Sequence, residues 1–195
     1  MVFCYTPSLR YHLRFDADTT PSLLTMNPEE LQLMFAARLD LFEPISGHPT
    51  GADFTRLSEE LTTIIIPLYY DVEKGNHNLL GIMMDEGNYN QQYRAKFPTP
   101  TKPAVYGETI PDNATNVACA KPEASHKANI ADCQLFASAK HETRDFILAV
   151  VDDKWVHKLC DPVTFYTAVL SLELLDHLKT LCGGLHALDV LMLQN

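Results

Sequence analysis

The chain has 195 residues, of which 46% are apolar, and this is enough to build the hydrophobic core of one ordinary domain or of two small ones. Its 15 basic and 25 acidic residues give a net charge of −10, which disfavours binding to the phosphates of DNA or RNA. The richest apolar runs are only about ten residues long and no apolar leader is present, so we expect a cytoplasmic protein without a membrane span.

The first predicted element is an extended or disordered lead-in over residues 1–26, which show no sustained period and contain two prolines. A helix is predicted next, because Asn27 is a good cap and Pro28 suits the first helical position. Its apolar stripe is formed by Leu31, Met34, Phe35, Leu39 and Phe42. This helix is expected to end before Pro44.

A second helix is predicted to begin at a cap on Thr50 or Asp53 and to end at Pro67. Its apolar side chains recur at spacings of three and four: Phe54, Leu57, Leu61, Ile64 and Ile65. The β-branched run 64–66 is also compatible with a strand, but it continues the helical stripe, so helix is favoured. A weaker third helix is expected over 79–93, where two glycines lower the helix propensity. These elements make up an N-terminal helical half, residues 27–96.

A proline-rich segment, residues 97–113, is predicted to be an extended connection to a C-terminal helical half, residues 114–195. That half is expected to open with a long helix that starts around or after Pro122. A narrow stripe of small residues and one leucine marks its face: Ala124, Ala128, Ala131 and Leu135. The apolar block 146–151 either continues this helix or begins another.

Three further helix starts are predicted, at Asp152-Asp153, at Asp161-Pro162 and at Ser171. The Ser171 helix has Leu174, Leu175, Leu178, Leu181 and Cys182 on one face and is stopped by Gly183-Gly184. A last apolar helix over 185–195 ends with its apolar face unpaired, which predicts that the chain is a fragment of a longer product. The expected fold is therefore all-α, a helical bundle in two halves joined by the proline-rich connection.

No residue pattern is typical of an enzyme, so we predict no catalytic residue, no cofactor and no metal ligand. His141-Glu142 resembles the start of the zinc-protease motif HExxH, but Asp145 stands where the second His is required. Cys160 with His157 lacks a third group to orient the pair. An enzyme whose pocket joins His141, His157 and Asp153 is kept as a further hypothesis. The five cysteines are odd in number and widely spaced, which predicts reduced, buried thiols.

Physical association is the better-supported kind of function. The lone tryptophan and the hairpin formed by 171–182 and 185–193 carry the largest apolar faces of the C-terminal half. Internal packing is the simpler interpretation of both, and any part left exposed would be an oligomerisation surface. The candidate packing or self-association residues are Trp155, Leu175, Leu178, Leu188 and Leu191.

Four segments of the C-terminal half carry a family resemblance: FILAVVDDKW at 146–155, DPVTFYT at 161–167, LLDHL at 174–178 and CGGLHALDVL at 182–191. Together with 39–50 and 77–81, they resemble the gag-like region of copia-type LTR retrotransposon polyproteins. The resemblance implies a helical, non-enzymatic structural protein that self-associates into capsid-like particles around element RNA. Because the chain has no Cys/His zinc knuckle, we expect RNA contact only through segments outside it. The alternative hypothesis is a helical adaptor that binds a host protein as a monomer or dimer.

Overall fold

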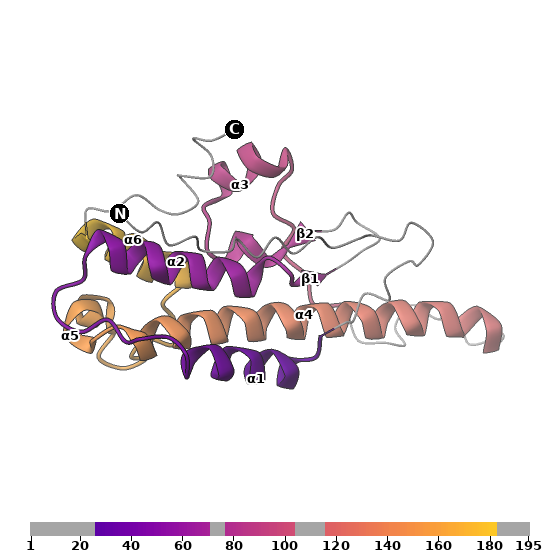
Figure 1. Ribbon diagram of the computed structural model, residues 1–195. Helices are drawn as coiled ribbons and strands as arrows, with labels where there is room; N and C mark the ends of the chain where they lie inside the picture. The colour runs from indigo at the N-terminus through magenta and orange to yellow at the C-terminus, as the bar shows by residue number, and fades with distance from the viewer. Residues whose placement is uncertain (1–25, 71–76, 104–115, 183–195) are drawn as a thin grey trace, which may run out of the picture.

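A long helix, α4 (Asn116–Val150), is the axis on which the other helices pack (Figure 1). The computed structural model describes residues 26–70, 77–103 and 116–182. In the view of Figure 1, α1 (Pro28–Leu39) lies below α4, and α2 (Gly51–Ile65) lies above it. α6 (Ser171–Cys182) packs against both α2 and α4. The predicted all-α class is confirmed.

α1 begins where its capping residues predict. The Asn27 side chain accepts a hydrogen bond from the backbone N–H of Glu30 at 2.9 Å, and the Glu30 carboxylate accepts one from the N–H of Asn27 at 3.0 Å. This reciprocal capping box satisfies two N–H groups that the helix itself leaves free. The predicted apolar stripe faces α4, where Phe35 and Phe42 contact the ring of Phe146 edge-on at centroid distances of 6.1 and 5.6 Å.

α2 is capped in the same way, and both of its candidate caps take part. Thr50 is the N-cap, and the N–H of Thr50 donates to the Asp53 carboxylate at 3.0 Å. The run 64–66 is helical or caps the helix, so the strand alternative is wrong. The whole predicted stripe is no more than 2% exposed, and burial of each such side chain contributes about 1.5–3 kcal/mol.

The predicted third helix over 79–93 is wrong as a single element. A short antiparallel pair, β1 (Tyr69–Tyr70) with β2 (His77–Asn78), leads into a 3-10 turn, η2 (Leu79–Ile82). A separate helix, α3 (Glu86–Tyr93), starts at a new cap on Asp85. The break has a packing cause as well, because Gly81 lies so close to the ring of Phe97 that any side chain there would overlap it.

α4 starts at Asn116, so the predicted start at Pro122 is too late. One proline near a helix start removes a single backbone hydrogen bond, and a helix of 35 residues tolerates that loss. The N-terminal part of α4 extends past α1 and α2 in Figure 1, and the alanines of the predicted stripe are exposed there. Burial begins at Leu135. The block 146–151 continues this helix as far as Val150.

After α4 the chain turns sharply through α5 (Asp153–Val156) and η3 (His157–Leu159), and Asp152 caps α5 as predicted. The predicted helix start at Asp161-Pro162 is wrong. The Asp161 carboxylate does accept two backbone N–H groups as a cap would. However, Phe165 adopts a left-handed conformation with φ +53°, which folds the chain back after one turn.

Ser171 was predicted to cap α6, and this is also wrong. Ser171 is the first helical residue and is 3% exposed. Its hydroxyl donates to the carbonyl of Lys140 at 3.3 Å, which ties α6 to α4. The N–H of Leu170, one residue earlier, donates to the Glu173 carboxylate at 3.0 Å. The predicted apolar face of α6 is oriented into the core, with Leu174, Leu175 and Leu178 buried.

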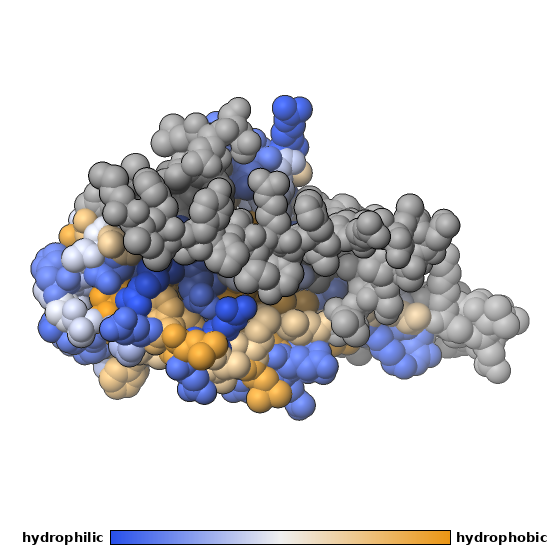
Figure 2. Space-filling model, in the orientation of Figure 1, coloured by the Kyte–Doolittle hydropathy of each residue, from blue (hydrophilic) through white to orange (hydrophobic). Residues whose placement is uncertain are grey.

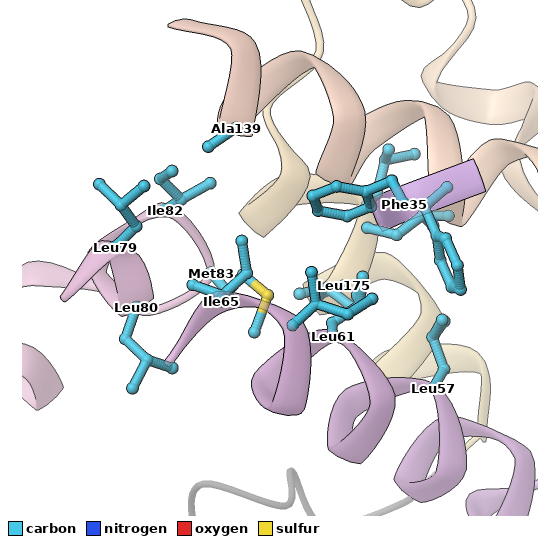
Figure 3. Close-up of a cluster of buried hydrophobic side chains, with 14 of the residues drawn as sticks. Phe35, Leu57, Leu61, Ile65, Leu79, Leu80, Ile82, Met83, Ala139 and Leu175 are labelled. Carbon is cyan, nitrogen blue, oxygen red and sulfur yellow. The ribbon is translucent and has the colours of Figure 1, made fainter. Parts of the chain in front are cut away.

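One hydrophobic core joins the two halves of the chain. Figure 3 shows the buried cluster, to which α2, η2, α4, α6 and α1 all contribute side chains. The N–H of Ile45, between α1 and α2, donates to the carbonyl of Val150 at the end of α4 at 2.7 Å. The proline-rich segment is without helix or strand over 97–103, and its remainder, like the lead-in 1–25, lies outside the described residues. It therefore connects two parts of one packed unit.

Candidate functional site

Two of the candidate packing or self-association residues are internal. Leu175 and Leu178 are 0% and 2% exposed and belong to the hydrophobic core, in which Figure 3 labels Leu175. Their side chains pack within the chain and present no surface to a partner. Leu188 and Leu191 lie outside the described residues.

Trp155 fixes a corner of the fold. Its indole N–H donates to the carbonyl of Gly47 at 2.5 Å, and the ring of His48 meets its ring at a centroid distance of 4.6 Å. The backbone carbonyl of Trp155 lies 2.8 Å from Nε2 of His177 on α6. Gly47 adopts φ +81°, a conformation that favours glycine. Trp155 thus holds the loop between α1 and α2 against α5 and α6.

The residues that resemble a zinc-protease motif form a cluster of hydrogen-bonded polar side chains. Nε2 of His141 lies 3.1 Å from the Asp145 carboxylate, and the Arg144 guanidinium contacts both side chains. Arg144 also donates to the carbonyl of Thr167 at 3.0 Å, which holds the segment before α6 against α4. Burial raises the pKa of Glu142 on the same helix. Over the described ranges, no three His, Cys, Asp or Glu side chains gather to hold a metal ion.

The side chains of Cys160 and His157 have different partners. The Cys160 thiol lies 3.9 Å from the carbonyl of Asp161, while Nδ1 of His157 is 4.0 Å from the Asp153 carboxylate. His141 lines a cleft whose lining includes neither His157 nor Asp153. Cys133, Cys160 and Cys182 are free thiols and are half-buried, where the sequence predicted buried ones.

A shallow cleft of about 300 Å³ lies between α4 and the segment that precedes α6. We call it the α4 cleft. The Lys140 ammonium lies 5.7 Å from the centre of the Phe136 ring at this site. The cleft therefore combines aromatic and aliphatic walls with a basic rim. Its lining residues are Phe136, Ala137, Lys140, His141, Arg144 and 167–171.

An apolar face of α1 is exposed to solvent. Leu33 is 70% exposed and Leu41, just beyond the helix, is 81% exposed, with the exposed Ala36 and Ala37 between them. In Figure 2, apolar spheres interspersed with hydrophilic ones occur along the lower edge of the molecule, where α1 lies. We call this surface the α1 outer face. Sequence reasoning missed it, although positions 33, 37 and 41 form a second apolar stripe at a spacing of four.

A second exposed apolar group is carried by the turn 161–165, which we call the DPVTF turn. Val163 is 84% exposed and Phe165 is 66% exposed. A left-handed conformation at an aromatic residue costs of the order of 1–3 kcal/mol, and such strain clusters at binding sites. Both the conformation and the exposure of Phe165 are therefore unfavourable for the isolated chain.

No protein-family model, curated protein or solved structure matches this chain. None of the helices in the described segments combines the length and the apolar character needed to cross a bilayer. The functional assignment therefore depends on the surfaces and clusters of the molecule itself, and the most distinctive of these are the two exposed apolar surfaces.

Proposed function

We propose that this chain is a non-enzymatic helical protein that works by self-association, as the resemblance to a gag-like structural protein implies. The observation that carries the proposal is the α1 outer face. α1 buries one side in the core and exposes Leu33 and two alanines on the other, and the exposed Leu41 follows just beyond the helix. Exposed apolar groups of this kind are typical of protein contact surfaces.

A second copy of the chain is the partner that this face fits. Its small central residues allow two helices to approach closely, while Leu33 and Leu41 supply larger groups at the two ends. In an antiparallel pair, Leu33 of each copy lies opposite Leu41 of the other, so the surface is self-complementary about a two-fold axis. The same arrangement brings the acidic first turn, with Glu29 and Glu30, towards the end of the helix that carries Arg38.

The size of the surface predicts a weak contact. A helix of 12 residues is about 18 Å long, and two such helices bury less than the roughly 1,200–2,000 Å² of a stable interface. A single α1 pair is therefore expected to dissociate at low concentration. Assemblies with several weak contacts per copy gain stability through multivalency, so larger particles are expected as the concentration rises.

The test is light scattering coupled to size-exclusion chromatography over a range of protein concentrations, with Leu33→Glu and Leu41→Glu beside the wild type. We expect the mass of the wild type to rise with concentration, and either charge substitution to reduce that rise. Added RNA is expected to leave the mass unchanged. The matched control is Ile66→Glu, which places the same charge on an exposed apolar residue at the end of α2, away from α1, and should leave the rise in mass unchanged.

Thermal unfolding of the same variants shows whether the α1 outer face binds a second copy or is covered by another segment of the same chain. Leu33 is exposed, so Leu33→Glu is expected to leave the melting temperature of the monomer unchanged. A wild type that remains monomeric at every concentration would refute the proposal and favour the adaptor hypothesis. A Leu33→Glu protein that melts earlier without any change in mass would show that another segment of the same chain covers this face.

A further inference from the structure

We infer that the DPVTF turn is a second self-association element, which inserts Phe165 into the α4 cleft of another copy. The inference rests on the proposed function and adds a contact that is independent of the α1 outer face, because no residue of α1 lines the cleft. It explains why the chain holds a bulky aromatic side chain in an unfavourable conformation and in contact with water.

Backbone hydrogen bonds close the turn. The N–H of Asp161 donates to the carbonyl of Phe165 and the N–H of Phe165 donates to the carbonyl of Asp161, both at 2.9 Å. Within this ring, the Asp161 carboxylate accepts the N–H groups of Val163 at 2.8 Å and Thr164 at 2.7 Å. These bonds close the turn at its base, where Phe165 pairs with Asp161, and the Phe165 side chain is 66% exposed there.

The two residues that follow the turn are hydrogen-bonded to side chains of neighbouring elements. The Tyr166 hydroxyl donates to the Asp153 carboxylate at 2.7 Å, and Arg144 of α4 donates to the carbonyl of Thr167 at 3.0 Å. The turn is thus anchored to α5 and α4 before any partner arrives. A binding element fixed in advance loses little conformational entropy on association, which favours affinity.

The α4 cleft has the size and the chemistry for an aromatic ring. Its volume of about 300 Å³ exceeds that of a phenylalanine side chain, and its walls include Phe136, Val169 and Leu170. Leu170 is 44% exposed and so has apolar surface still to cover. A ring that enters between these walls can contact Phe136 edge-on and lie near the Lys140 ammonium, two favourable aromatic contacts.

The charges of the turn and the cleft are complementary. Lys140 lines the cleft together with His141 and Arg144, which already contact the Asp145 carboxylate, whereas the base of the turn carries the Asp161 carboxylate. Hydrogen bonds from the backbone N–H groups of Thr164 and Val163 lower the pKa of Asp161, so it is ionised at neutral pH. Each copy therefore offers an acidic turn to the basic rim of its partner.

Turn and cleft lie next to each other on the same chain, since Thr167 follows the turn and also lines the cleft. Two copies related by a two-fold axis can therefore exchange Phe165 side chains. One such contact gives a dimer. Combined with the α1 outer face, it gives each copy two different neighbours, which is the minimum for an assembly larger than a dimer.

The decisive variant is Phe165→Gly, because glycine accepts the positive φ and removes the ring without straining the turn. We expect its melting temperature to remain close to that of the wild type and its association to stop at the α1 dimer. Leu33→Glu should stop at the other dimer, and the double variant should be monomeric. Lys140→Glu, on the rim of the cleft, should resemble Phe165→Gly in mass.

Three outcomes overturn the inference. If Phe165→Gly assembles like the wild type while Leu33→Glu does not, the proposed function stands and the turn plays no part in it. If Phe165→Gly lowers both the melting temperature and the mass, the ring packs within its own chain. If Lys140→Glu has no effect whereas Phe165→Gly does, the occupied surface is different from the α4 cleft.

Discussion

Replacement of Gly81 by alanine has two effects of opposite sign on the stability of the fold. Gly81 lies within the 3-10 turn η2, and an alanine in a helical conformation is favoured over glycine by about 1 kcal/mol. However, a methyl group at this position overlaps the ring of Phe97. The ring cannot move freely, because it packs against Tyr89 and Phe136 at centroid distances of 5.0 and 5.9 Å.

The steric effect should be the larger of the two. Overpacking costs about 1–3 kcal/mol, and displacement of Phe97 also weakens two aromatic contacts of about 0.5–1.5 kcal/mol each. After the propensity gain is subtracted, we expect Gly81→Ala to lower the free energy of unfolding by about 2 kcal/mol. For a chain of 195 residues this corresponds to a fall of about 4–8 °C in melting temperature.

Urea denaturation followed by circular dichroism measures this change, with Gly87→Ala as the matched control. A methyl group at Gly87 meets only the Asp85 carboxylate, at 3.1 Å, and because Gly87 lies in α3 its replacement should raise the free energy of unfolding by up to about 1 kcal/mol through helix propensity alone. A double-mutant cycle isolates the cause: in a Phe97→Ala background, Gly81→Ala should become neutral or stabilising. The reasoning is refuted if Gly81→Ala is as stable as the wild type, or if its cost persists without the Phe97 ring.

Two further predictions concern polar side chains of the helices. The Ser58 hydroxyl is buried and has no hydrogen-bond partner among the described residues, so Ser58→Ala should raise the free energy of unfolding by up to about 1 kcal/mol. Ser171→Ala should lower it by about 1 kcal/mol, because the Ser171 hydroxyl is hydrogen-bonded. The opposite order in urea denaturation would contradict this. Hydrogen bonds from Thr50 lower the pKa of Asp53 below its ordinary 3.8, so its stabilising contribution is complete above that value and is lost as the pH falls through the lower, folded-state pKa. Asp53→Asn should therefore be less stable than the wild type at about pH 7, and the difference should shrink as the pH falls below the ordinary pKa; a difference that does not depend on pH would exclude this explanation.

The sequence was sufficient for elements whose local and tertiary signals agree. α1 and α2 each combine a side-chain cap with an apolar stripe of helical period, and both elements and their buried faces were predicted correctly. The predictions failed at residues that can cap a helix but that are followed by a different backbone conformation in the folded chain. Asp161 accepts backbone N–H groups as a cap does, but the turn closes at Phe165 instead of continuing as a helix.

The candidate surfaces were harder to predict, because exposure depends on which of two apolar stripes faces the core. The pattern of α1 indicated the buried stripe that contains Phe35, but it did not show that the apolar residue Leu33 on the other side of the helix stays exposed. In the same way, Leu175 and Leu178 are strongly apolar whether they meet their own core or a partner. Only the packing of α1 and α6 on α4 resolves these alternatives.

The core shared by the two halves also has a kinetic consequence. Phe35 and Phe146 are about 110 residues apart, so the pairing of α1 with α4 closes a long loop, and such contacts slow folding. During synthesis, α1 and α2 leave the ribosome before the helices that cover their apolar faces. At that stage the nascent chain exposes Phe54, Leu57 and Leu61 as well as the α1 outer face. A chaperone that binds apolar helices is therefore expected to associate with the chain until α6 has been made.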